Sequence, residues 1–409
     1  MPPENPPENP ANPDLRALNL KIAGAYDLVP YDPVAIPAVD PERVFGLAAL
    51  YGGAPEAADF DVLDLGCGTG SQLDRIAARN NGRLVGTDLS RSACELARAR
   101  CAKYGDRCRI VNADFLDLDA AALGQFDLIY NIGVLYVTPP AVQERILALI
   151  AACLKPKGVA VISYYTGMIA MLTAGAHQML SAAVDPTASP DVQVRQARTR
   201  LQEIGGILTR QPGDHKVTLA ALQQLYARSD SILFHEMLNQ NFTAIFTSSL
   251  DTTLGARGVH FLNWMMAERL GNIASSRGRA TLADAQGLAG GGYYYAAFGK
   301  CAASQGANPG VDHVRWQTEI KRIGTDAKSG LGVFRDPGLG VTATAGNHMT
   351  EAMLEVLVEG PAMWARLLEA AEAKRAGRGI APGAAGALEQ DFLVLWQHGL
   401  VTPLWTPPS

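Results

Sequence analysis

The sequence lacks the features of several common classes of protein. Its 35 Lys and Arg residues are outnumbered by 40 Asp and Glu residues, so there is no excess of positive charge to neutralise phosphates, and we expect no nucleic-acid partner. The six cysteines form no CxxC pair and have no histidine in zinc spacing, and nothing upstream resembles a secretory signal, which indicates a reduced, cytoplasmic protein. His, Asp and Glu do not cluster in metal spacing either, so we predict no metal.

One long stretch without charge needs a separate explanation. Residues 158–184 contain no Asp, Glu, Lys or Arg and are long enough to cross a bilayer. The stretch opens on Val159-Ala160-Val161-Ile162-Ser163, which is typical of a buried strand, and later includes His177-Gln178. We therefore predict a strand followed by a helix, and no membrane span.

The overall composition favours a folded chain of more than one domain. Hydrophobic residues make up 48% of the chain, charged residues make up 18%, and the mean hydropathy is +0.04. Such a composition supplies enough apolar surface for substantial cores. At roughly 100 to 200 residues per domain, 409 residues predict two or three domains.

Hydrophobic patterning divides the chain into regions of different fold class. Between residues 60 and 162, apolar runs of strand length alternate with amphipathic helical segments, which predicts an α/β fold with a Rossmann-like, doubly wound parallel sheet. Beyond Gly167 the pattern becomes mainly helical, with a returning strand expected near residues 259–264. The expected divisions are a disordered Pro-rich tail (1–14), the sheet-containing core (15–167), a helical inserted or appended region (168–310), and a C-terminal region (311–409) with a Gly-rich linker (329–344) and a small helical domain (349–405).

The strongest motif is a glycine-rich turn directly after a predicted buried strand. Residues 62–70 read VLDLGCGTG, with Gly66, Gly68 and Gly70 placed to let the backbone approach a ligand at the start of the following helix. A dinucleotide site has the spacing GxGxxG, which suits a pyrophosphate. Here the spacing is GxGxG, and Asp64 stands two residues before the first glycine. A carboxylate suits an ammonium group and repels a pyrophosphate, so the motif favours S-adenosylmethionine.

Two further acids follow at the ends of the next predicted strands. Asp88, followed by Leu89, lies about twenty residues after the glycines, where its carboxylate can accept both ribose hydroxyls. Asp114 and Phe115 end the third strand, where an acid can hold the adenine amino group and an aromatic ring can cover the base. A single acid at a strand end often only caps the next helix. In this order and spacing, the three acids together predict a cofactor site.

These residues resemble the class I S-adenosylmethionine-dependent methyltransferases. The resemblance narrows to bacterial methyltransferases with a methyltransferase regulatory domain, which include the rickettsial protein lysine methyltransferases that act on outer-membrane proteins. The segment 26–31 (YDLVPY) resembles the family's YDxxPY, 126–140 (FDLIYNIGVLYVTPP) resembles FDYIxxHGVYSWVPP, 163–166 (SYYT) resembles SYNT, and 235–239 (HEMLN) resembles HEYLN. The resemblance extends over nearly the whole chain from Leu15 and is strongest before Gly167. The chain departs from the family at Asn131-Ile132, at Tyr165 and near residue 315.

The resemblance implies a cofactor, its product and a set of site residues. The cofactor is S-adenosylmethionine and the product is S-adenosylhomocysteine. Tyr26, Cys67 and Asn131 join the glycines and acids above as cofactor-binding residues, and Tyr31, Asn131, Tyr136 and His235 are the candidate catalytic residues. Asn131 follows the fourth strand and can orient an amine, although a helix-capping Asn is equally common there. Tyrosines are also ordinary core residues, and a His-Glu pair on a helix often only packs between domains.

Three functions remain open at this stage. The resemblance favours methyl transfer to a protein or peptide side chain, most of all a lysine-type amine, with the helical region presenting the substrate. The alternatives are N- or O-methylation of a small metabolite, and a regulatory scaffold that binds the cofactor without turnover. The sequence leaves open the acceptor atom, the degree of methylation, the role of the C-terminal domain and the oligomeric state, for which a homodimer is one option.

Overall fold

The computed structural model describes residues 13–29, 31, 35–238, 241–265, 276–289, 292–300, 314–337, 342–380, 385–398 and 400–406. Residues 1–12 of the predicted tail lie outside these ranges. The first helix, α1, spans Pro13–Leu28 and so begins two residues before the expected start of the fold. A proline is well tolerated at the first position of a helix, because the N–H that it lacks has no partner within the helix.

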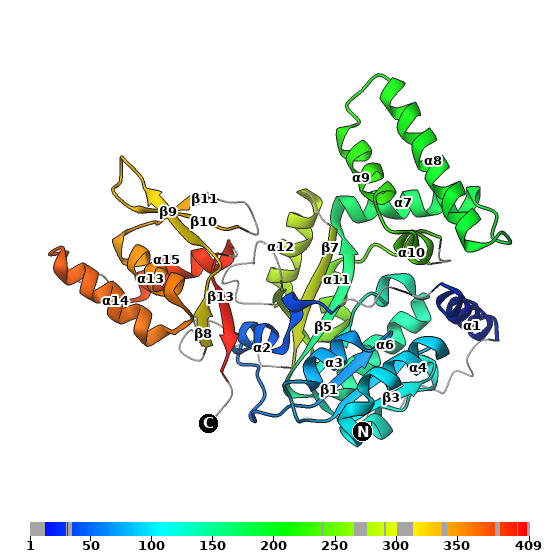
Figure 1. Ribbon diagram of the computed structural model, residues 1–409, viewed down its shortest axis with the longest axis horizontal. Coiled ribbons are helices and arrows are strands. Elements are labelled where there is room, and N and C mark those ends of the chain that lie inside the picture. The colour runs from blue at the N-terminus through cyan, green and yellow to red at the C-terminus, as the bar shows by residue number, and fades with distance from the viewer. Residues whose placement is uncertain are drawn as a thin grey trace.

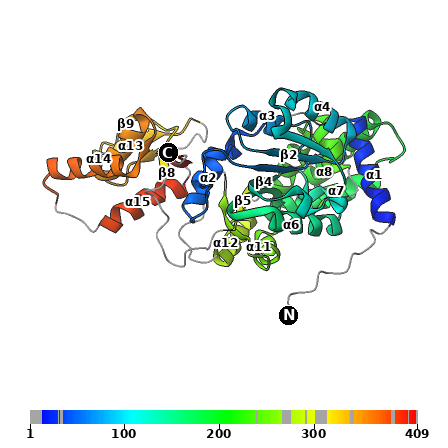
Figure 2. The same cartoon turned by 90° about the horizontal axis from the view of Figure 1, so that it is seen from below.

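A seven-stranded sheet forms the centre of the molecule (Figures 1 and 2). The strand order is β3-β2-β1-β4-β5-β7-β6; β1 to β5 are parallel, and β7 is antiparallel to both β5 and β6. This arrangement confirms the predicted α/β, doubly wound fold. The strands are β1 (Val62–Leu65), β2 (Leu84–Asp88), β3 (Cys108–Asn112), β4 (Phe126–Asn131), β5 (Leu154–Thr166), β6 (His260–Trp264) and β7 (Gly292–Gly299).

Helices cover both faces of the parallel part of the sheet, as the alternating pattern predicts. The last helix of this part ends at Cys153, and β5 begins directly after it at Leu154, before the predicted strand start at Val159. Lys157 is the one non-glycine residue with positive φ among the described residues, which marks an irregular start to this strand. The helices of this part are α2 (Pro41–Ala49), α3 (Ser71–Ala77), α4 (Arg91–Cys101), α5 (Ala120–Leu123) and α6 (Pro140–Cys153), with 3₁₀ turns η1 (Pro37–Val39), η2 (Ala102–Arg107), η3 (Phe115–Asp117) and η4 (Leu135–Val137).

The strand register brings the motif residues to one edge of the sheet. Leu65 pairs with Thr87, Asp88 pairs with Asn112, and Asn131 pairs with Ile162. Because β1 to β4 are parallel, their C-terminal ends meet at the same edge. The glycine turn, Asp88, Asp114 and Asn131 therefore lie along this edge.

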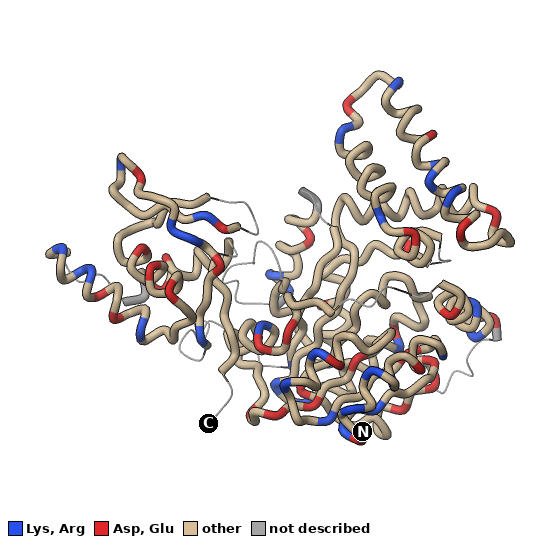
Figure 3. Tube along the Cα trace, in the orientation of Figure 1, with Lys and Arg blue, Asp and Glu red and all other residues tan. Residues whose placement is uncertain are grey.

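A helical region follows the sheet-containing core and stands beside the C-terminal edge of β5 (Figure 1). Its own apolar cluster includes Leu180, Ala197, Leu201 and Leu233. α7 carries no charged residue, whereas acidic and basic residues alternate along much of the rest of the chain (Figure 3). None of the described helices combines the length and apolar character needed to cross a bilayer. The region contains α7 (Gly167–Ala183), α8 (Pro190–Arg210), α9 (Lys216–Tyr226), α10 (Asp230–Ile232) and the π-helical turn η5 (Leu233–Met237), and α11 (Thr247–Gly255) and α12 (Ser276–Ala289) follow beside β6 and β7.

The C-terminal region is mixed rather than purely helical, which corrects the sequence-based expectation. The predicted linker 329–344 contains β10 (Gly332–Arg335) and β11 (Thr342–Thr344), which form an antiparallel sheet with β9 (Lys321–Thr325). Phe334 is 2% exposed, whereas all the residues of β9 are exposed, so only the part of this sheet around Phe334 is covered. A second small sheet contains β8 (Val314–Gln317), β12 (Ala362–Met363) and β13 (Thr402–Trp405), and the helices are α13 (His348–Glu359), α14 (Trp364–Gly377) and α15 (Ala385–Gln397).

The end of the chain packs back onto α2, far upstream in the sequence. A Cβ at Gly46 would lie 2.3 Å from the carbonyl oxygen of Pro403, so this close approach requires glycine. Phe45 contacts Trp405 edge-on, with ring centroids 5.2 Å apart. The C-terminal region is thereby fixed to the side of the sheet-containing core (Figure 2).

Candidate active site

The glycine turn after β1 has the conformation that its sequence predicts. Gly66, Gly68 and Gly70 have φ values of 92°, 50° and 77°, which other residues rarely adopt. A Cβ at Gly66 would lie 2.3 Å from Cγ2 of Val134, whereas a Cβ at Gly68 would meet open space. The turn is therefore held closely on one side and leaves room for a ligand at its middle. Cys67 belongs to the same turn, but its thiol is buried, and burial raises its pKa well above the ordinary value.

Asp88 connects the second strand to this turn. One carboxylate oxygen accepts a hydrogen bond from the Gly68 N–H at 2.8 Å, and the other accepts from the Ser90 N–H at 2.9 Å. Burial raises the pKa of Asp88 in spite of these bonds. The carbonyl oxygen of Leu89 accepts from the side chain of Asn112 at 2.9 Å, so Leu89 contributes backbone that fixes the loop.

Asp64 is a buried acid that receives no hydrogen bond at its carboxyl group from the described residues. Its side chain lies within the sheet, and the residue is 5% exposed. Burial, together with the nearby charge of Asp88, raises the pKa of Asp64 to about 7. A cationic group placed beside Asp64 would offset both effects. The ammonium group of an amino-acid ligand therefore fits this position.

Asp114 and Phe115 follow the third strand, and α1 reaches over them. Asp114 accepts a hydrogen bond from the side-chain amide of Asn19 at 2.7 Å and another from the Leu116 N–H at 3.0 Å. Phe115 begins η3 and is 8% exposed. The pair therefore lies at the expected edge of the sheet, with Asn19 as an unexpected neighbour.

Asn131 lies at the expected end of β4 and is hydrogen-bonded to the neighbouring strand. Its side chain is completely buried at the end of β4, where its amide donates to the carbonyl oxygen of Leu65 at 2.9 Å. It caps no helix; it ties β4 to β1. Its side-chain oxygen is buried and has no donor among the described residues, which suits a ligand N–H.

A second cluster, which we call the Glu236 cluster, lies beside the cofactor motif at the ends of β4 and β5. It consists of Glu236 with Tyr31, Tyr136 and Tyr165, whose hydroxyls donate to its carboxylate at 3.1, 3.0 and 2.9 Å. Glu236 is 7% exposed. The two carboxyl oxygens of Glu236 therefore accept all three hydroxyl donors. Burial and the neighbouring carboxylate raise the pKa of both Tyr136 and Tyr165 well above 10, so both keep their protons.

Further aromatic rings surround this cluster. The rings of Tyr165 and Tyr293 lie 4.9 Å apart, and Tyr136 contacts Tyr293 edge-on at 5.7 Å. Phe242 packs against Tyr165 at 5.2 Å. The Tyr293 hydroxyl shares a 2.7 Å hydrogen bond with Ser163. A carboxylate among aromatic faces is a favourable environment for an organic cation.

The arrangement of His235 argues against the predicted catalytic role. Its Nε2 lies 2.6 Å from the carbonyl oxygen of Val29, which can only accept, so this nitrogen carries the hydrogen. The ring stacks on Tyr26, with centroids 4.1 Å apart. Burial lowers the pKa of His235 from its ordinary value, which favours the neutral ring. His235 therefore holds the C-terminal end of α1. Its Nε2 is engaged by the backbone and does not face the Glu236 cluster.

Tyr26 lies between the two halves of the site. The pKa of its hydroxyl is raised by burial and by the charges of Asp88 and Glu236.

Three residues of the site were not identified as candidate site residues from the sequence. Tyr293 stands in a run of three tyrosines beyond the recognisable motifs, Asn19 precedes them, and Glu236 follows His235 in a motif that signalled the pair without showing which member matters.

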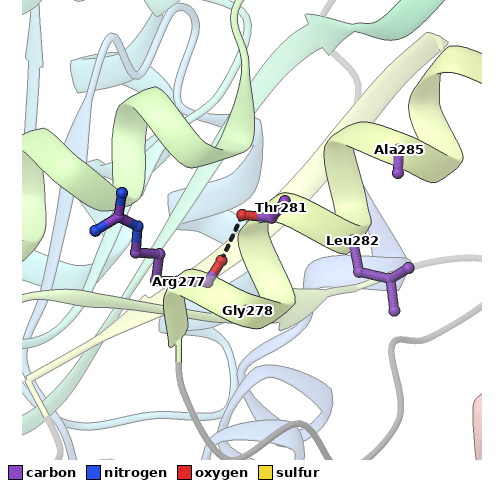
Figure 4. A pocket seen from close by; sticks show the side chains of 5 residues that line it. All are labelled: Arg277, Gly278, Thr281, Leu282 and Ala285. Carbon is purple, nitrogen blue, oxygen red and sulfur yellow. Dashed lines mark hydrogen bonds between the residues drawn. The ribbon is translucent and has the colours of Figure 1, made fainter.

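A surface pocket lies elsewhere, along the exposed side of α12 (Figure 4). None of its lining residues belongs to the cofactor motif or to the Glu236 cluster. The hydroxyl of Thr281 donates back to its own helix, at the carbonyl oxygen of Arg277. The pocket is lined by Arg277, Gly278, Thr281, Leu282 and Ala285.

Comparison with known proteins agrees with this geometry. Residues 62–158, which contain the glycine turn and all three acids, match the methyltransferase domain family. A carboxy-S-adenosyl-L-methionine synthase from Wolinella succinogenes is 34% identical over 107 residues, which cover 24% of this chain and 41% of that protein. An uncharacterised protein of Rickettsia prowazekii is 32% identical over 145 residues, or 35% of this chain. The match spans 58% of that relative's length, and a match to a second protein of the same organism spans 26% of its length.

A solved structure resembles nearly the whole chain. The structure of PKMT2 from Rickettsia typhi in complex with AdoHcy superposes with a TM-score of 0.72, covering 93% of this chain and 78% of that one at 20% sequence identity. At this identity the likeness establishes the fold alone. The chain therefore contains a methyltransferase domain at residues 62–158 and has the fold of the class I S-adenosylmethionine-dependent methyltransferases.

Proposed function

We propose that this chain is an S-adenosylmethionine-dependent methyltransferase that methylates an amine on a protein or peptide side chain, of the lysine type. The observation that carries the choice of acceptor is the buried carboxyl group of Glu236, which lies among aromatic rings next to the cofactor motif. A carboxylate with aromatic faces attracts an alkylammonium group both by charge and by cation–π contact. The resemblance to the rickettsial-type protein lysine methyltransferases supports the same acceptor class.

The residues at the sheet edge fit the proposed cofactor. Asp64 is a buried acid without a hydrogen-bond donor in the described chain, and the buried oxygen of Asn131 likewise has no donor there. Asp88 would receive the ribose hydroxyls and Asp114 the adenine amino group. The open space at Gly68 leaves room for the backbone of the turn to contact the ligand. S-adenosylmethionine, when bound, supplies an electrophilic sulfonium methyl group.

The chain's own contribution to the reaction is positioning and the exclusion of water. Glu236 attracts the acceptor ammonium, and Tyr136 and Tyr165 hold its carboxylate in place through their hydroxyl groups. An amine must lose a proton before it attacks. Burial among the rings of Tyr165 and Tyr293 disfavours the charged amine, whereas the adjacent carboxylate of Glu236 favours it, and that carboxylate receives the proton that the amine releases.

A small amine is the second candidate acceptor. The Glu236 cluster is largely buried, and Tyr31, which is 38% exposed, is its most accessible member. A compact metabolite would fit such an enclosed position, whereas a side chain from a protein would have to enter past Tyr31. The two acceptors differ in size, so they can be separated directly.

The test is a radiolabelled methyl-transfer screen on cell lysate fractionated by size, with the full chain and labelled S-adenosylmethionine. Label in the macromolecular fraction, abolished in Asp88→Ala, is the expected result. Label only in the small-molecule fraction would overturn the protein acceptor in favour of a metabolite. Tight binding of S-adenosylhomocysteine without label in either fraction would indicate a regulatory scaffold.

A further inference from the structure

The helix α1 contributes a buried polar side chain to the cofactor motif, although it lies outside the matched domain. Asn19 is 4% exposed, and its amide nitrogen donates to Oδ2 of Asp114 at 2.7 Å. The two residues are 95 positions apart in the chain. A buried amide is costly unless it is hydrogen-bonded, so this contact fixes both side chains.

Both oxygens of Asp114 are thereby held in a defined orientation. Oδ1 accepts from the Leu116 N–H at 3.0 Å, and Oδ2 accepts from Asn19. Each carboxylate oxygen has two acceptor positions, so each keeps one for a further donor. Without Asn19, only the single bond from Leu116 would orient the carboxylate.

We propose that Asn19 is a positioning residue for adenine recognition: by holding Asp114, it presents a fixed carboxylate to the exocyclic amino group of the base. This inference rests on the proposed cofactor. An amino group donates to the carboxylate, whereas an oxo group at the same ring position can only accept and faces a second acceptor across the contact. A firmly held carboxylate therefore discriminates between the base with the amino group and the base with the oxo group. A mobile carboxylate can turn away from the oxo group and loses this discrimination.

The position of α1 does not depend on Asn19 alone. Asp27 accepts hydrogen bonds from the Ser90 hydroxyl at 2.6 Å and from the Ser92 hydroxyl at 2.7 Å. At the C-terminal end of the helix, His235 donates to the carbonyl oxygen of Val29 at 2.6 Å. Both contacts lie at the C-terminal end of α1 and hold that end in place, so replacing Asn19 removes one contact and leaves the others.

The experiment compares two ligands by titration calorimetry on the full chain: S-adenosylhomocysteine, and S-inosylhomocysteine, in which an oxo group replaces the amino group of the base. The wild-type chain should prefer the adenine ligand. Asn19→Leu, which keeps the side-chain volume without the amide, should lower that preference about tenfold. Arg16→Gln, which breaks an exposed ion pair between the same helix and Asp117, is the matched control and should keep the wild-type preference.

A double-mutant cycle separates positioning from general structural damage. Asp114→Asn alone should lower the preference, and adding Asn19→Leu in that background should change it no further. A wild-type preference in Asn19→Leu, or an equal additional loss in the Asp114→Asn background, would overturn the inference. If Asn19→Leu does not fold, as judged by its thermal midpoint, Asn19→Ser takes its place with the same expected loss. A wild-type chain that binds neither ligand would overturn the proposed cofactor instead.

Discussion

The cofactor end and the acceptor end of the site differ in how far apart their residues lie along the chain. Asp64, Asp88 and Asp114 each stand at or just after the end of a strand, within three consecutive βα units. The acceptor end is assembled around Glu236, which is contacted by tyrosines 205, 100 and 71 positions away. A site built from repeated local units can be read from sequence, whereas a site built from distant segments depends on how those segments pack.

The largest effect that separates the two ends is expected from Glu236→Gln. The amide removes the negative charge that attracts the acceptor, while its size is nearly unchanged. We expect the rate of label transfer to fall by about a thousandfold, within the range for loss of a group that acts directly on the reacting amine. The measurement is incorporation of radiolabel at saturating cofactor. A rate within tenfold of the wild-type value would contradict the assignment of Glu236.

The next largest effect belongs to the cofactor end. Asp88→Ala removes the proposed ribose contacts and the bond from the Gly68 N–H, so affinity for S-adenosylhomocysteine should weaken by about 2 to 3 kcal/mol. Calorimetric titration measures this change, and circular dichroism of the same sample checks the fold. Unchanged affinity would remove Asp88 from the cofactor site.

A pH dependence tests the charge of Asp64. Burial and the charge of Asp88 raise the pKa of Asp64 to about 7 in the folded chain, above a value of about 3.9 for an unfolded chain. Between these values the native state holds a proton that the unfolded chain has released. The contribution of Asp64 to stability therefore falls as pH rises from about 4 to about 7 and is lost above that.

The same ionisation controls ligand binding with the opposite sign. A ligand ammonium favours the charged carboxylate, so affinity for S-adenosylhomocysteine should rise with pH through 7, by at most about tenfold per pH unit. Titrations between pH 6 and pH 8 measure the slope. Asp64→Asn should abolish this slope; a slope equal to that of the wild-type chain would show that another group is responsible.

The smallest effect is expected at the residue next to Glu236. His235→Asn should lower label transfer by less than about threefold and destabilise the chain by about 1 kcal/mol, the usual loss for one hydrogen bond. Because burial lowers the pKa of His235 from its ordinary value, the ionisation of the ring moves to lower pH, and the rate–pH profile between pH 7 and pH 8 should keep its shape. A profile that loses an inflection in this variant would restore His235 as the base.

The same contrast explains which parts of the fold could be predicted. The alternation of apolar runs and helical segments between residues 60 and 162 predicted the strands β1 to β5, because each is an apolar run bounded by turn residues and followed by a helix. Strand β7 was missed because Tyr293, Tyr294 and Tyr295 follow a run of glycines that looks like a loop, and because the strand is antiparallel to its neighbours. β10 and β11 were missed because the surrounding glycines look like a linker, although Phe334 is buried.

Among the site residues, too, those at strand ends could be predicted from the sequence, whereas contacts between distant segments could not. The positions of Asp64, Asp88 and Asp114 at the sheet edge could be derived from strand ends alone. The contact from Asn131 to Leu65 could not, since it depends on the pairing of β4 with β1 across 66 positions. The choice between His235 and Glu236 was also beyond sequence, because both lie on the π-helical turn η5 and only tertiary packing decides which side chain faces the tyrosines.

The most direct test of the separation between the two ends is the affinity of Glu236→Gln for S-adenosylhomocysteine, measured by calorimetry beside the wild-type chain and Asp88→Ala. If the acceptor end is a distinct unit, Glu236→Gln should bind with an affinity within about twofold of the wild-type value, because the hydrogen bonds that Glu236 receives come from tyrosines and not from the cofactor motif. Asp88→Ala should bind far more weakly. A loss of binding in Glu236→Gln as large as that in Asp88→Ala would contradict the division into two ends.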